Sequence, residues 1–374
     1  MNRSSLRRAA GPGVAALALA LGLSACAAGN EGGDTGNGDS EATVEGLSGT
    51  VNGAGASSQE AAQQAWQAGF QSANPDVTVN YDPVGSGGGR EQFISGGVSF
   101  AGSDAYLDDE EGELSGAKER CNNEDPIEIP NYVSPIAIIY NLEGVDELNL
   151  SGETLARIFT GDITKWNDEA IAADNPDAEL PDTNITAVHR ADDSGTTDNF
   201  TAYLESAAPD VWTHGEVGEW PIQHGEAAPQ TSGVVSAVTN GQGTIGYADA
   251  SQAGDLGVAN IKVGEDYVGP TPEAAAKVLE VSPRVEGRSE VDMAVDLDRS
   301  TSEAGAYPVV LTSYLLACQT YEDQSEADLV KGYLSYIISD EGQDAAAESA
   351  GSAPLSDALQ EEAQGIVDAI KAQG

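Results

Sequence analysis

The chain has 374 residues, of which 62 are Asp or Glu and 16 are Lys or Arg, so its formal net charge is −46. This acidity excludes nucleic acid and anionic lipid as electrostatic partners, because both carry negative charge. At first sight it also argues against an anionic ligand. With 40% hydrophobic residues the chain is too apolar to be disordered, and its length is typical of about two domains.

Residues 1–25 predict a signal peptide for export. Basic residues precede an apolar run at 14–23, which is too short to span a bilayer and leads into the sequence LSAC at 23–26. This ending is similar to a bacterial lipobox, which implies cleavage before Cys26 and attachment of lipid, such as palmitate, at that residue. The Gly-, Asn- and acid-rich segment 26–46 predicts a flexible tether. We therefore expect a lipid-anchored protein on the outer face of the cell membrane, in a Gram-positive bacterium.

From residue 47 onward, short apolar strands alternate with helices, which is typical of parallel α/β construction. Ser57 and Glu60 predict a capping box for a helix that ends near Asn74. Strands are predicted at 47–51, 77–81, 98–102, 132–140, 184–189 and 243–247, with a further apolar segment at 307–317. Later helices are predicted at 153–159, 197–205, 327–338 and 356–369.

Four strand ends lead into turns where small residues and polar groups mark the expected start of a helix. A helix start exposes unpaired N–H groups and a partial positive charge, which together favour an anion. Arg190, four residues before Ser194, adds a guanidinium group suited to a tetrahedral oxyanion, although a surface salt bridge with a neighbouring Asp is the alternative. The four junctions are Ser57 with Ser58, Ser86, Ser103 with Asp104, and Ser194 with Gly195 and Thr196.

These motifs make the sequence similar to the phosphate-binding component of the bacterial phosphate-specific ABC importer. The resemblance implies a type II periplasmic-binding-protein (Venus-flytrap) fold of two α/β lobes, each a mainly parallel sheet flanked by helices, joined at a hinge. Lobe one would comprise 47–131 and 306–374, and lobe two 132–305. The matching motifs are NGAGASS at 52–58, VGSGG at 84–88, FAGSD at 100–104, ITKWN at 163–167, VHRADDSGTT at 188–197, GTIGY at 243–247 and AYP at 306–308.

Two further cysteines, Cys121 and Cys318, are expected to pair, because an exported protein enters an oxidising compartment. The lobes implied by the resemblance strengthen this expectation, since they would place both cysteines in the same lobe.

The resemblance also implies which residues hold phosphate. Ser57 stands where many members have Thr, and Ser58 stands where Phe is common, so we expect Ser58 to act through its N–H group. Gly87 stands where a second Ser is frequent, which leaves Ser86 as the donor there. Asp192 would orient Arg190, with Asp193 as the weaker choice. The implied ligand set is Ser57, Ser58, Ser86, Asp104, Arg190, Ser194, Gly195 and Thr196.

Asp104 is expected to select phosphate over sulfate. An ionised carboxylate accepts a hydrogen bond from the P–OH group that phosphate retains at neutral pH, whereas sulfate presents only bare oxygens. A buried mismatch of two acceptors is costly, and sites built around a required donor discriminate by roughly 10⁴-fold.

The expected function is high-affinity phosphate binding and delivery to an ABC permease with its cytoplasmic ATPase, by a monomer that uses no cofactor or metal and is not an enzyme. Three alternatives are a binding protein for another tetrahedral oxyanion such as sulfate or molybdate, a surface phosphatase, and a scaffold or adhesion protein. The sequence has no Walker A, HExxH or GxSxG pattern, which argues against an enzyme. Asp104 argues against a fully ionised anion.

Overall fold

The computed structural model describes residues 46–109 and 112–374. The predicted signal peptide, Cys26 and the tether up to residue 45 lie outside the described residues. Strands and helices alternate in the first third of the described chain. These elements are β1 (Gly49–Gly55), α1 (Glu60–Ala73), β2 (Val77–Asp82), α2 (Ser86–Ile94), β3 (Phe100–Ser103) and α3 (Glu113–Arg120).

The alternation continues through the middle and is followed by helices at the C-terminus. The middle contains β4 (Ile127–Asn141), β5 (Asn149–Leu150), α4 (Gly152–Thr160), α5 (Glu169–Asp174), β6 (Thr186–Arg190), α6 (Gly195–Ala207), β7 (Glu226–Ala228), α7 (Gln230–Asn240), β8 (Thr244–Asp249), η1 (Ala250–Gln252), β9 (Gly257–Val258), β10 (Asn260–Val263), β11 (Asp266–Val268) and α8 (Pro272–Val281). The C-terminal part contains β12 (Val310–Ala317), β13 (Thr320–Tyr321), α9 (Gln324–Ile338), α10 (Asp340–Ala350), α11 (Asp357–Asp368) and β14 (Lys371–Ala372).

One large sheet connects the two halves of this α/β fold, in the order β2-β1-β3-β12-β4-β8-β6-β7. The outer pairs β1–β2, β1–β3, β6–β7 and β6–β8 are parallel, as the alternation of strands and helices predicts. The central pairs are antiparallel: β12 with β3 and β4, and β4 with β8. The apolar segment at 307–317 therefore forms a strand that returns in the opposite direction between the two parallel sets.

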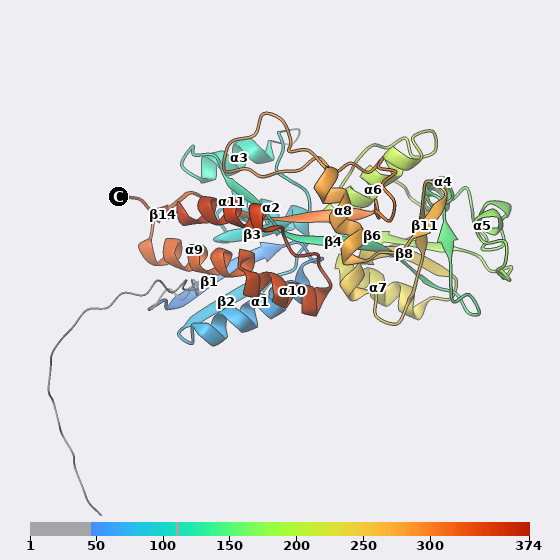
Figure 1. Cartoon of the computed structure of the whole chain (residues 1–374), viewed down its shortest axis with the longest axis horizontal. Coiled ribbons are helices and arrows are strands. Elements are labelled where there is room, and N and C mark those ends of the chain that lie inside the picture. Colours follow the sequence, from blue (N-terminus) through green and yellow to red (C-terminus); the bar gives the residue numbers. More distant parts are fainter. Residues whose placement is uncertain (1–45, 110–111) are drawn as a thin grey trace, which may run out of the picture. The chain divides into compact units, whose positions relative to one another are not determined.

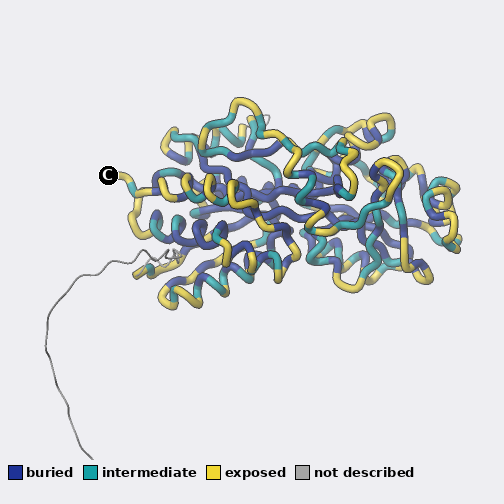
Figure 2. Tube along the Cα trace, in the orientation of Figure 1, coloured by how far each residue is buried: buried dark blue, intermediate teal, exposed yellow. Residues whose placement is uncertain are grey.

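Strand β4 is the crossing element between the halves (Figure 1). Its first part pairs with β12 up to Pro135, and from Ile136 onward it pairs with β8. We call the half with β1, β2, β3 and β12 the first half, and the half with β6, β7 and β8 the second half. The strands in the middle of the molecule are buried, and the exposed residues lie on the outer helices and loops (Figure 2).

Cys121 and Cys318 form a disulfide with a Cα–Cα distance of 5.2 Å across a sequence separation of 197 residues. It joins the end of α3 to the residue after β12, and both elements belong to the first half. None of the helices in the described ranges is both long and apolar enough to cross a bilayer.

Asp249 lies at the crossing, where β8 first pairs with β4 opposite Ile136. The carboxyl is fully buried, and its Oδ1 accepts hydrogen bonds from the Tyr132 hydroxyl at 3.0 Å and from the N–H of Ser251 at 3.0 Å. Burial is the main cause that raises the pKa of Asp249 to about 6, and the surrounding donors oppose it.

This pKa predicts that the free energy of unfolding depends on pH through Asp249. Folding favours the protonated form of the Asp249 carboxyl. The contribution of this protonation to the free energy of unfolding is therefore complete below about pH 4 and is lost as the pH rises through about 6. Asp249→Asn removes this dependence, and its effect on the free energy of unfolding should differ by about 3 kcal/mol between pH 4 and pH 7. Urea denaturation at both pH values measures the difference, with the exposed Asp210→Asn as the control. An effect that is equal at both pH values contradicts the prediction.

Candidate functional site

The predicted site residues lie where β1, β3 and β6 end. Strands β1 and β3 are parallel, with Gly55 paired to Gly102, so the residues that follow them emerge at the same edge of the sheet. Ser57 and Ser58 follow β1, Asp104 follows β3, and Arg190 is the last residue of β6. Two helices begin at the same place, α2 at Ser86 and α6 at Gly195.

Asp104 is the centre of a cluster of buried hydroxyl groups and is itself 3% exposed. Ser58 Oγ lies 2.8 Å from each carboxylate oxygen, and Thr196 Oγ1 donates to Oδ2 at 3.2 Å. Ser313 Oγ donates to Oδ1 at 2.5 Å. The pKa of Asp104 is raised, because burial raises it more than the three hydroxyl donors and the charge of Arg190 lower it. The donors come from both halves of the fold.

Arg190 is buried and is held by a carboxylate two residues further along the chain. Its Nε donates to Asp192 Oδ1 at 2.9 Å, and a terminal nitrogen donates to Oδ2. Asp192 Oδ1 also accepts from the N–H of Gln230 at 2.9 Å, which fixes the carboxylate. Asp193 instead pairs with Arg90 at 3.4 Å. Of the two candidates for orienting Arg190, Asp192 is therefore the one in contact with it.

The starts of α2 and α6 lie against each other. Ser86 Oγ accepts from the N–H of Asp104 at 3.1 Å, and Ser194 caps α6 by accepting from the N–H of Thr197 at 3.2 Å. A Cβ atom on Gly195 would lie 2.6 Å from Ser86 Oγ and 2.7 Å from Cβ of Asp104. Only glycine therefore permits this close approach of the two halves.

Two details of the predicted junctions are wrong. Ser57 does not form a capping box with Glu60: the N-cap of α1 is Gln59, and Ser57 Oγ hydrogen-bonds Thr231 Oγ1 at 3.0 Å. The Ser57 hydroxyl therefore bonds to a residue of the second half and does not cap α1. Nor does a helix begin at Asp104, because the next helix, α3, starts at Glu113.

Three residues of the cluster were not expected from the sequence. Ser313 holds the Asp104 carboxylate, Thr231 pairs with Ser57, and the Tyr247 hydroxyl accepts from the N–H of Arg190 at 3.2 Å. A hydroxyl residue inside the apolar strand β12 is the sequence signal for Ser313. Tyr247 lies in the GTIGY motif, and Thr231 lies in the first turn of α7, where its N–H group donates to Ser57 Oγ at 3.2 Å.

The arrangement is chemically suited to an oxyanion that carries a proton. It combines the starts of α2 and α6, buried hydroxyls, a guanidinium group and one carboxylate acceptor. Within residues 46–109 and 112–374, no group of three or more His, Cys, Asp or Glu side chains is placed to hold a metal ion.

Comparisons with known proteins identify the family of the chain. A family model described as a PBP superfamily domain matches residues 40–341. Phosphate-binding protein PstS 2 of Mycobacterium tuberculosis is 33% identical over 370 residues, which cover 96% of this chain and 98% of that protein. Phosphate-binding protein PstS 3 of the same organism is 36% identical over 330 residues, covering 85% of this chain and 87% of that protein.

Solved structures show the same fold. A high-affinity periplasmic phosphate-binding protein, PfluDING, solved with bound phosphate, superposes with a TM-score of 0.68 at 22% identity and covers 84% of this chain and 93% of its own. A phosphate-binding protein from Stenotrophomonas maltophilia superposes with a TM-score of 0.66 at 21% identity and covers 85% of this chain and 93% of its own.

Proposed function

The chain belongs to the PBP superfamily, and we propose that it binds inorganic phosphate outside the cell membrane and delivers it to an ABC permease for import. The observation that carries the proposal is the buried Asp104 carboxylate within a set of hydroxyl donors, with Arg190 nearby. The names of the mycobacterial relatives support the same ligand.

Phosphate would be held by donors from both halves. Ser58 and Thr196 donate to Asp104 in the structure, and each would turn its hydroxyl hydrogen toward a phosphate oxygen. Arg190 has five N–H donors, and its two bonds to Asp192 leave others for the ligand. The proposed ligand set is Ser57, Ser58, Ser86, Asp104, Arg190, Ser194, Gly195 and Thr196.

Asp104 would then accept a hydrogen bond from the P–OH group of phosphate. Ser313 holds the carboxylate from β12, so Asp104 keeps one donor when Ser58 and Thr196 turn away. A fully ionised sulfate would place an oxygen acceptor against this carboxylate and would be rejected.

Binding would be coupled to closure because the ligand set spans both halves. A ligand that contacts both stabilises the closed state by its differential affinity, and the permease would recognise that state. We propose the lobes as 47–131 with 306–374, and 132–305. We further propose that the protein acts as a non-catalytic monomer, without cofactor, and that a lipid on Cys26 anchors it to the outer face of a Gram-positive cell membrane.

Titration calorimetry of the purified protein with phosphate, arsenate and sulfate tests the proposal. We expect saturable binding of phosphate and of arsenate, which retains a proton in the same way, and negligible binding of sulfate. Preferential binding of sulfate would favour the other-oxyanion function, and release of phosphate from a phosphoester would favour a phosphatase. Absence of phosphate binding overturns the proposal.

A further inference from the structure

Asn199, in the second turn of α6, connects the two halves of the fold beside the ligand set. Its Nδ2 donates to the main-chain carbonyl of Asp104 at 2.8 Å and to that of Gly195 at 2.8 Å. Its Oδ1 accepts a hydrogen bond from a terminal nitrogen of Arg299. The side chain is 4% exposed, and these three bonds engage both ends of the amide.

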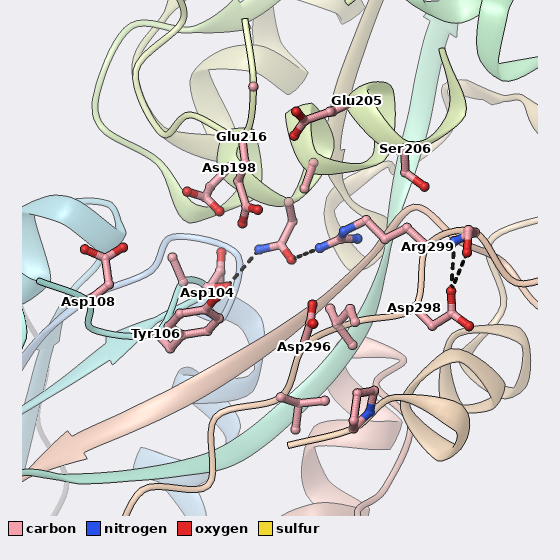
Figure 3. A pocket seen from close by; sticks show the side chains of 18 of the residues that line it. Asp104, Tyr106, Asp108, Asp198, Glu205, Ser206, Glu216, Asp296, Asp298 and Arg299 are labelled. Carbon is pink, nitrogen blue, oxygen red and sulfur yellow. Dashed lines mark hydrogen bonds between the residues drawn. The ribbon is translucent and has the colours of Figure 1, made fainter. Parts of the chain in front are cut away.

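Arg299 fixes the orientation of this amide. It belongs to the segment that returns from α8 to β12, and its other terminal nitrogen donates to the carbonyl of Val310 at 2.8 Å, at the start of β12. Asn199, Arg299 and Asp104 line one cavity. Figure 3 shows the Arg299 guanidinium group on the side of its residue that faces Asp104, with a dashed hydrogen bond. A guanidinium group only donates, so Asn199 must present its oxygen to Arg299 and its nitrogen to the two carbonyls.

The two carbonyls belong to residues with direct roles in the proposed site. Asp104 supplies the carboxylate acceptor, and Gly195 lies so close to the first half that a Cβ atom on it would be 2.6 Å from Ser86 Oγ. The pair of bonds to one nitrogen therefore sets the position of the Asp104 main chain relative to the first turn of α6. The bond to Gly195 lies within α6, whereas the bond to Asp104 joins different halves and is lost when the halves move apart.

We propose that Asn199, held by Arg299, is a positioning residue that keeps the two halves closed over phosphate and so slows its release. The proposal rests on the proposed function. Asn199 acts through Asp104 and Gly195, so its loss should accelerate dissociation of phosphate.

Asn199→Leu, which removes both donors at similar volume, tests the proposal. We expect the rate at which radiolabelled phosphate leaves the full-length protein to rise about 10- to 100-fold, because the buried bond from Asn199 to Asp104, which joins the two halves, is lost. Calorimetry should show a matching fall in affinity. Glu205→Gln is the matched control, because Glu205 lies on the same helix and the same cavity but is exposed and should leave both values unchanged.

Arg299→Met provides a second variant that leaves α6 intact. It should also accelerate release, and the double variant should release phosphate no faster than the faster single variant, because the two residues act as one unit. A merely structural role would lower the unfolding temperature without changing the release rate. Wild-type release rates in whichever of the two variants folds overturn the inference, whereas failure of the wild-type protein to bind phosphate overturns the proposed function instead.

Discussion

Replacing Arg190 with Met should weaken phosphate binding by about 10²- to 10⁴-fold, the cost of removing one partner from a buried charge pair. The Arg190 side chain is 2% exposed, so water cannot take over its role. Its bonds to Asp192 orient the guanidinium plane, and Asp192 is itself fixed by Gln230. Arg190→Lys keeps the charge but loses the planar fork, and we expect an intermediate affinity.

Calorimetry with phosphate measures the effect. Arg284→Met is the charge-matched control, since Arg284 pairs with Glu362 at 2.9 Å on the surface, and we expect it to bind phosphate like the wild type. An affinity of Arg190→Met within about threefold of the wild type, which corresponds to less than one ordinary hydrogen bond, would contradict the assigned role.

Replacing Asp104 with Asn should remove the discrimination against sulfate while phosphate still binds. The amide nitrogen donates a hydrogen bond where the carboxylate only accepts, so a bare sulfate oxygen finds a partner there. We expect the ratio of phosphate to sulfate affinity to fall from roughly 10⁴ to below about 10². Competition calorimetry measures this ratio, and continued negligible competition by sulfate would show that Asp104 is not the selecting group.

Lowering the pH should reduce the ratio of phosphate to sulfate affinity of the wild-type protein, as the Asp104→Asn substitution does. A protonated Asp104 donates as Asn does, and because burial raises its pKa, this change should begin at a higher pH than for an exposed Asp. The Asn variant, which has no proton to gain there, should show a flatter dependence of its selectivity on pH.

The sequence was informative wherever neighbours along the chain determine the geometry. The alternation of strands and helices predicted the parallel pairs, and residues at the ends of parallel strands came together at one edge. The antiparallel position of β12 could not be read from its apolar run, because a buried strand has the same composition in either direction.

Contacts between residues of the two halves could not be predicted from the sequence. Ser57 and Glu60 have the spacing of a capping box, yet the hydroxyl of Ser57 pairs with Thr231, which is 174 residues away. The prediction for Ser58 concerned its N–H group, and it did not include the bond that the Ser58 hydroxyl donates to Asp104. No local pattern encodes such pairs, because their energy depends on how the two halves approach each other.

The disulfide has a consequence for the integrity of the folded chain. Cys121 and Cys318 lie on either side of the entire second half, so they close a covalent ring that contains β4, α8 and the return to β12. A single protease cut anywhere between them opens the ring but leaves both fragments joined through the sulfur atoms. The fragments would separate on a denaturing gel only after reduction, so a chain cut once between the two cysteines would keep its two fragments covalently linked.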